Sequence, residues 1–178
     1  MEKCTIRTHV LTALTEQDRT TKARLDALLL ADLTATDEYQ SACTLATYMA
    51  LPHEFDTSLV IRRALADGKR VLIPRTRKTD RSMQMCAYDP ENLTRTSFGL
   101  LEPSLDAPAV PLNEIDLIHV PAVAVNTGGY RIGYGAGYYD RFLASYTGST
   151  LITAYRDIQL VEFSPEDFDV PAMRLLMR

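Results

Sequence analysis

Fifteen consecutive residues do most to decide the fold of this 178-residue chain: Gly129-Tyr-Arg-Ile-Gly133-Tyr-Gly135-Ala-Gly137-Tyr-Tyr-Asp140-Arg-Phe-Leu143. The stretch holds four of the chain's eight glycines. An apolar run that ends at Val125 precedes it, and a helical spacing of apolar side chains follows it. This order predicts a strand, a glycine-rich loop and the start of a helix, as in α/β proteins.

The loop from Gly133 to Gly137 is predicted to bind an anion. Glycines let backbone N–H groups approach an anion closely, and a helix N-terminus adds a partial positive charge. The spacing matches neither the dinucleotide-binding motif nor the P-loop. Arg131 adds a cation on one side, and Tyr138, Tyr139 and Asp140 add two aromatic faces and a possible magnesium ligand on the other. The alternative, a left-handed turn with core tyrosines and Asp140 as a helix N-terminal charge, stays open here.

Length and composition predict a single domain spanning residues 1–178. The chain is 46% hydrophobic, has no apolar run near the roughly 20 residues that span a bilayer, and begins without a hydrophobic signal segment. We therefore expect a cytoplasmic, monomeric protein that binds a small molecule and no membrane. The net charge of −4 argues against nucleic-acid partners. Three cysteines without Cys-x-x-Cys spacing indicate neither a disulfide framework nor a zinc site.

Apolar periodicity predicts a helical N-terminal third, with helices over residues 3–14, 16–33 and 37–51. Asp56 or Thr57 can cap a further helix that runs to Asp67 and is ended by Gly68. Short apolar runs predict strands over residues 70–73, 83–88, 117–125, 151–155 and 174–177. Because these runs are apolar throughout, they favour a mostly parallel sheet flanked by helices in a Rossmann-like three-layer architecture. Ligands of such sheets bind beyond the carboxyl ends of strands, where we expect the glycine loop.

The loop resembles the signature of the 5-formyltetrahydrofolate cyclo-ligase family, Gly-x-Arg-Leu-Gly-x-Gly-x-Gly-Tyr-Tyr-Asp-Arg, from which only Ile132 departs. Other segments resemble the family in the same order: Lys3 to Arg7, Tyr48 to Thr57, Gly68 to Pro74, Gly99 to Pro103, Asp116 to Pro121, and Gln159-Leu160. The resemblance therefore covers nearly the whole chain.

The resemblance implies an enzyme that uses ATP and Mg²⁺ to convert 5-formyltetrahydrofolate, free or polyglutamylated, to 5,10-methenyltetrahydrofolate. ADP and phosphate are released, and the intermediate is an N5-iminium phosphate. Nucleotide binding is assigned to Lys3, Arg7, Arg131, Ile132, Gly133, Tyr134, Gly135, Ala136, Gly137, Tyr138 and Tyr139. Folate binding is assigned to Met49, Glu54, Tyr134, Gly135, Ala136, Gly137 and Tyr138. Arg131, Tyr138 and Asp140 are the expected catalytic residues, and Asp140 and Asp169 are the expected magnesium ligands.

Departures from the family keep a second function open. Bacterial members commonly carry a histidine and an acid where this chain has Phe168 and Met173, and many members carry glycine at Ala136. These differences favour, as the alternative, a folate- or nucleotide-binding paralogue without turnover.

Several other polar residues are interpreted as structural. The histidines belong to no nucleophile motif, and His119 is expected to be hydrogen-bonded in or near the core. Glu102 precedes Pro103, which already explains a turn. The basic cluster of Arg75, Arg77, Lys78 and Arg81 is expected to be solvated, and a weaker hypothesis gives it the glutamate tail of a folate.

Overall fold

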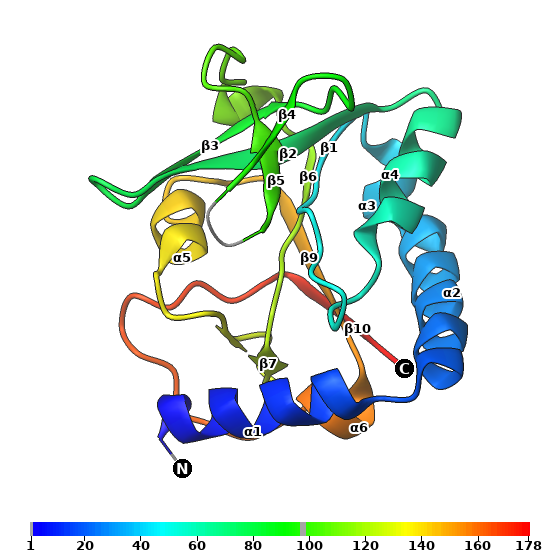
Figure 1. The fold of residues 1–178 in the computed structure, drawn as a ribbon, viewed down its shortest axis with the longest axis vertical. Helices are drawn as coiled ribbons and strands as arrows, with labels where there is room; N and C mark the ends of the chain where they lie inside the picture. Colours follow the sequence, from blue (N-terminus) through cyan, green and yellow to red (C-terminus); the bar gives the residue numbers. More distant parts are fainter. Residues whose placement is uncertain (1, 97–98) are drawn as a thin grey trace.

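Six strands form the central sheet: β1 (Thr44–Ala46), β2 (Arg70–Arg77), β3 (Ser82–Ala87), β6 (Leu117–His119), β9 (Ser149–Ala154) and β10 (Arg174–Met177). The computed structural model describes residues 2–96 and 99–178, and the strands lie in the order β10-β9-β6-β1-β2-β3 (Figure 1). Every neighbouring pair is parallel except the β2–β3 hairpin. The expected mostly parallel sheet is therefore confirmed, with one antiparallel edge strand.

Helices lie on both faces of this sheet (Figure 1). One face is covered by α2 (Arg19–Ala35) and α4 (Thr57–Ala66), with the short α3 (Asp37–Ser41) beside them, and the other by α5 (Tyr138–Leu143). Helix α1 (Lys3–Glu16) crosses the lower end of the fold, next to α6 (Arg156–Gln159), and η1 (Leu112–Glu114) is a 3-10 turn. The three-layer arrangement is confirmed. Among the described residues, no helix has the length and apolar character needed to cross a bilayer.

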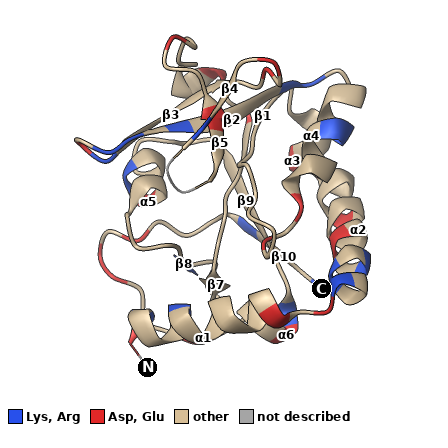
Figure 2. Ribbon diagram, viewed as in Figure 1, with Lys and Arg blue, Asp and Glu red and all other residues tan. Residues whose placement is uncertain are grey.

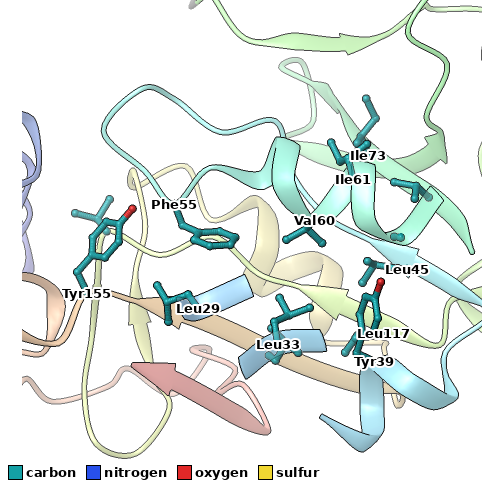
Figure 3. Close-up of a cluster of buried hydrophobic side chains, with 14 of the residues drawn as sticks. Leu29, Leu33, Tyr39, Leu45, Phe55, Val60, Ile61, Ile73, Leu117 and Tyr155 are labelled. Carbon is teal, nitrogen blue, oxygen red and sulfur yellow. The ribbon is translucent and has the colours of Figure 1, made fainter. Parts of the chain in front are cut away.

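Successive strand residues point to opposite faces of the sheet, which explains why the strand sequences are apolar throughout. Leu45 and Leu117 belong to the hydrophobic cluster under α2 and α4 (Figure 3). The residues that follow them, Ala46 and Ile118, belong to a second cluster against α5. All four side chains are fully buried, so the sheet has a dry core on each side.

Side-chain caps explain where the helices begin. Asp18, Thr36 and Asp56 precede α2, α3 and α4, and each accepts a hydrogen bond from a backbone N–H group of the first turn. Gly68, with a φ of +73°, lies just past the end of α4. The helices predicted over residues 3–14 and 16–33 and up to Asp67 are confirmed to within three residues at each end.

Two predicted elements are wrong in part. The helix predicted over residues 37–51 ends at Ser41, and strand β1 begins at Thr44. A three-residue strand that is buried on both faces shows no alternation, so its apolar residues also fit a helix. The strand predicted over residues 117–125 is split around Pro121, which lacks a backbone N–H for the ladder.

Two antiparallel ribbons stand apart from the central sheet, and neither was predicted. The first pairs β7 (Ala124–Val125) with β8 (Arg131–Ile132), and the second pairs β4 (Leu93–Arg95) with β5 (Leu101–Pro103). The β7–β8 ribbon carries the chain from the end of β6 to the glycine loop and lies above helix α1 (Figure 1).

Candidate active site

The glycine loop connects β8 to α5. The expectation that it directly follows a strand of the parallel sheet is wrong, because the β7–β8 ribbon separates the two. Gly135 (φ +96°) and Gly137 (φ +67°) have left-handed backbone, which glycine adopts without strain. Gly137 is the residue before α5. Tyr134, Gly135 and Ala136 are exposed, so this part of the loop is open to a ligand.

Helix α1 brings the expected pair of cations to the loop. Lys3 and Arg7 lie one helical turn apart, and Figure 2 shows basic positions on the first turns of α1, on the side below the β7–β8 ribbon. The Nε of Arg7 donates to the Gly133 carbonyl oxygen at 2.6 Å. Its guanidinium carbon is 3.5 Å from the place that a Cβ of Gly135 would take. Because its hydrogen-bond partner is a neutral carbonyl, this contact leaves the positive charge of Arg7 uncompensated.

A second arginine, Arg141, contacts the loop at Ala136. Arg141 in α5 donates from Nη2 to the Ala136 carbonyl oxygen at 2.6 Å and to the Arg81 carbonyl oxygen at 3.1 Å. Arg81 lies in the β2–β3 turn, with a φ of +54°. Arg141 therefore ties the glycine loop to this hairpin. Sequence reasoning gave Arg141 no role, although its place four residues after Gly137 puts it one helical turn from the loop.

Arg131 and the C-terminal tail meet beside the loop. The Arg131 side chain is 4% exposed and donates to Asp140 Oδ1 and to the Val170 carbonyl oxygen, each at 2.7 Å. Burial lowers the pKa of Arg131, and the charge of Asp140 opposes this shift. A guanidinium stays protonated in proteins, so Arg131 is a fixed positive charge. The residue before Val170, Asp169, accepts a hydrogen bond from Lys3 Nζ at 2.5 Å.

The two carboxylates suit a magnesium ion in number and kind. The described hydrogen bonds of Asp140 go to Oδ1, and those of Asp169 go to Oδ2. The other oxygen of each carboxylate accepts none of these bonds. Mg²⁺ is typically bound by one or two carboxylates together with phosphate oxygens and water. Within residues 2–96 and 99–178 there is no group of three or more histidine, cysteine or acidic side chains that could hold a metal without a ligand's help. Asp140 and Asp169 are thus the residues that would hold such an ion, as two carboxylates beside phosphate oxygens and water.

The expected folate contacts lie on the other side of the loop. Glu54 is 8% exposed, and burial raises the pKa of its carboxyl group. Its Oε2 accepts from the Leu51 backbone N–H at 2.7 Å, and its Oε1 accepts from the Tyr134 hydroxyl at 3.0 Å. Met49 is half-buried and packs against the core cluster. The Tyr134 hydroxyl is also 2.9 Å from Nε2 of His53, which sequence reasoning had treated as incidental.

The tyrosines that begin α5 have different surroundings. Tyr138 packs against the second core cluster, and the guanidinium of Arg141 lies 5.9 Å from its ring centre. The Tyr139 hydroxyl is buried without a hydrogen-bond partner among the described residues, and burial raises its pKa. Ile132, at the start of the loop, is buried. Tyr138 and Tyr139 are thus packed against the core, as the alternative interpretation expects. Asp140 forms an ion pair with Arg131.

A model of the 5-formyltetrahydrofolate cyclo-ligase family matches residues 1–177. The chain belongs to this family. The cyclo-ligase of Haemophilus influenzae is 31% identical over 146 residues, which cover 79% of this chain and 78% of that relative. The cyclo-ligase of Mycolicibacterium smegmatis is 34% identical over 143 residues, covering 76% and 74%.

A solved structure agrees with this assignment to the cyclo-ligase family. The NMR structure of Aquifex aeolicus 5,10-methenyltetrahydrofolate synthetase matches with a TM-score of 0.85 at 28% identity, covering 99% of this chain and 90% of that one. Three predictions are therefore confirmed: the chain belongs to this family, it is an enzyme of this kind, and it has a mixed α/β architecture.

The residues that depart from the cyclo-ligase pattern are exposed at the protein surface. Phe168 is 68% exposed and Met173 is 73% exposed, and Ala136 is exposed as well. Phe168 immediately precedes Asp169, yet the contact between Asp169 and Lys3 is present. The substitutions therefore leave the pairing of helix α1 with the tail in place.

His119 of this family member is a hydrogen-bonded core residue, as expected. It is fully buried, with Nδ1 3.1 Å from the Thr47 hydroxyl and Nε2 3.0 Å from the Thr153 hydroxyl. Burial lowers the pKa of His119 to about 3, so the ring is neutral at physiological pH. It joins β6 to Thr47, just past β1, and to Thr153 in β9.

Two further polar residues have structural contacts. Glu102 accepts hydrogen bonds from the backbone and hydroxyl groups of Thr76, at 3.2 and 2.7 Å. Arg75 donates to the carbonyl oxygens of Ser104, Leu105 and Ala107, at 2.7–2.9 Å. The expectation of a solvated Arg75 is wrong, because these contacts use its guanidinium to order the segment after β5.

Proposed function

We propose that this protein catalyses the ATP-dependent conversion of 5-formyltetrahydrofolate to 5,10-methenyltetrahydrofolate, with release of ADP and phosphate. The observation that carries the proposal is that one loop touches both halves of the site. Gly133 contacts Arg7 on the side of the cations, and Tyr134 contacts the buried Glu54 on the other side. A loop in this position can hold a phosphate and a second substrate next to each other.

The nucleotide half would bind the phosphates through the loop's backbone N–H groups and the cations Lys3, Arg7 and Arg131. Two of these cations are paired with carboxylates, Lys3 with Asp169 and Arg131 with Asp140, which leaves Arg7 as the cation whose described contact does not balance its charge. A triphosphate would need a further cation, and the two carboxylates are the residues that would hold Mg²⁺. When bound, Mg²⁺ would supply positive charge to the phosphate oxygens.

The folate half would bind the pterin through Glu54. A carboxylate can accept two adjacent N–H donors, which is the pattern that a pterin ring presents. The side chain of Met49 would cover part of the ring's face. Tyr134 and the residues up to Tyr138 would line the junction between the two substrates.

In the proposed reaction the protein would position the substrates and stabilise charge, and it would not supply a nucleophile. The formyl oxygen would attack the γ-phosphorus, the bond from that phosphorus to ADP would break, and an N5-iminium phosphate would form. N10 would then attack the activated formyl carbon, its N–H proton would be lost to the departing phosphate, and the carbon–oxygen bond to that phosphate would break as the ring closes. Arg131, Arg7 and Lys3 would balance the negative charge that moves through both steps, and Asp140 would hold Arg131 in its orientation.

The proposal is tested by mixing purified protein with 5-formyltetrahydrofolate, Mg²⁺ and ATP and following the near-ultraviolet absorbance of the methenyl product. A reaction without ATP is the control. Growth of this absorbance that depends on ATP supports the proposal. A protein that binds both ligands without product would instead be the non-catalytic paralogue, which the exposed Phe168, Met173 and Ala136 favour. Binding of neither ligand would contradict both functions.

A further inference from the structure

Glu54 already has a hydrogen bond on each carboxylate oxygen. The Leu51 backbone N–H occupies Oε2, and the Tyr134 hydroxyl occupies Oε1. Glu54 is only 8% exposed, whereas Tyr134 is 50% exposed. The phenol group therefore stands between solvent and the carboxylate, where a ligand's N–H donors would have to arrive.

The two partners of this contact differ in how firmly they are held. Glu54 is the buried last residue of a turn that is closed by a backbone hydrogen bond, in which the Glu54 N–H donates to the Leu51 carbonyl oxygen at 3.0 Å. Tyr134 lies between Gly133 and Gly135 in an exposed part of the loop. A Cβ built at Gly133 would meet nothing within 4 Å, so there is space on that side of the loop. Of the two groups, the phenol is the one that can move.

His53 supports the phenol in this position. Its Nε2 is 2.9 Å from the Tyr134 hydroxyl oxygen. Because the phenol hydrogen is donated to Glu54, the imidazole must donate from Nε2 to the phenol oxygen. The result is a chain of two hydrogen bonds, from His53 to Tyr134 and from Tyr134 to Glu54, across residues 81 and 80 positions apart in the sequence.

We propose that Tyr134, supported by His53, is a latch that covers Glu54 by occupying its Oε1, and that binding of the folate displaces it. The inference rests on the proposed function, because it takes Glu54 as the residue that binds the pterin. Opening the latch would also move the loop at Gly133, where Arg7 binds. Folate entry would therefore be linked to the arrangement of the nucleotide half of the site.

The test compares Tyr134→Phe, which keeps the ring and removes the hydroxyl, with the parent protein. Calorimetric titration with 5-formyltetrahydrofolate should give a Kd about tenfold lower for the variant, since one hydrogen bond to a charged acceptor no longer has to be broken. In steady-state assays the change should appear in the KM for folate rather than in kcat. His53→Ala should change the Kd in the same direction by less. Tyr88→Phe, just past β3, is the matched control and should leave the Kd unchanged.

Melting temperatures of all variants establish that each is folded. A Tyr134→Phe protein that binds folate with the parent's Kd, or more weakly, overturns the latch, because the hydroxyl would then be neutral or a substrate contact. If the parent protein binds and converts folate but Tyr134→Phe binds it equally or more weakly, the latch fails and the proposed function stands. If neither the parent nor the variant binds folate, the proposed function fails and the latch with it.

Discussion

The turn between β7 and β8 offers a sharp test of how the site is supported. Gly129 has a φ of +79°, and a Cβ added there would lie 2.7 Å from the Ala172 carbonyl oxygen. The left-handed backbone costs an alanine about 1–2 kcal/mol, and the clash with a backbone atom adds about 1–3 kcal/mol because the tail must shift. We therefore expect Gly129→Ala to lower the free energy of unfolding by about 2–5 kcal/mol.

Gly68→Ala is the matched control for this measurement. Gly68 has a similar φ of +73°, but an added Cβ would meet nothing within 4 Å. The difference between the two variants isolates the clash, about 1–3 kcal/mol, which for a domain of this size is roughly 2–12 °C in Tm. Thermal unfolding followed by circular dichroism measures it. Equal melting temperatures of the two variants would refute the reasoning.

The same substitution should also reach the active site. The Ala172 N–H donates to the Gly129 carbonyl oxygen at 3.0 Å. Asp169 lies in the same C-terminal segment, three residues before Ala172. A displaced tail would move Asp169 away from Lys3. At a temperature where both variants are folded, Gly129→Ala should therefore lose more cyclo-ligase activity than Gly68→Ala.

Four further predictions concern single side chains. Glu54→Gln should raise the KM for folate about tenfold and leave nucleotide affinity unchanged, because the charged acceptor is lost; titration with each ligand checks this. Arg7→Ala should raise the KM for ATP at least about tenfold. Asp140→Asn, which keeps the shape of the side chain, should lower kcat by about 100-fold or more and should also lower the Tm, because the buried charge of Arg131 loses its carboxylate partner. Burial lowers the pKa of His119 to about 3, so the unfolded state binds the proton first. The free energy of unfolding should thus fall as pH drops below about 6.5, by up to about 1.4 kcal/mol per pH unit from this group, and urea titrations of His119→Gln should show a shallower dependence.

Local signals explain which parts of the fold were predictable. Asp18, Thr36 and Asp56 announce helix starts within a few residues, and all three cap helices in the structure. Strand β1 gives no comparable signal, because it is three residues long and becomes a strand only by pairing with β2 and β6. The effect of Pro121 on the next strand was visible in the sequence but was outweighed by the apolar residues around it.

The candidate site also has parts that the sequence predicts and parts that it does not. The spacing of Lys3 and Arg7 places both on one side of a helix, so their shared direction could be predicted from the sequence. The contacts from Arg141 to Arg81 and from His53 to Tyr134 join residues 60 and 81 positions apart. Such pairs depend on where the hairpin and the loop come to lie in the folded chain, and a single sequence holds no local pattern for them.

The cations of the nucleotide half differ in what balances their charge. Lys3 is 2.5 Å from Asp169 and 3.4 Å from Glu166, and Arg131 is paired with Asp140. Arg7 differs from both, because its described hydrogen bond goes to a neutral carbonyl oxygen. An approaching phosphate would therefore be attracted first by Arg7. Two carboxylates that each hold a protein cation are consistent with the proposed metal, which would arrive together with the nucleotide.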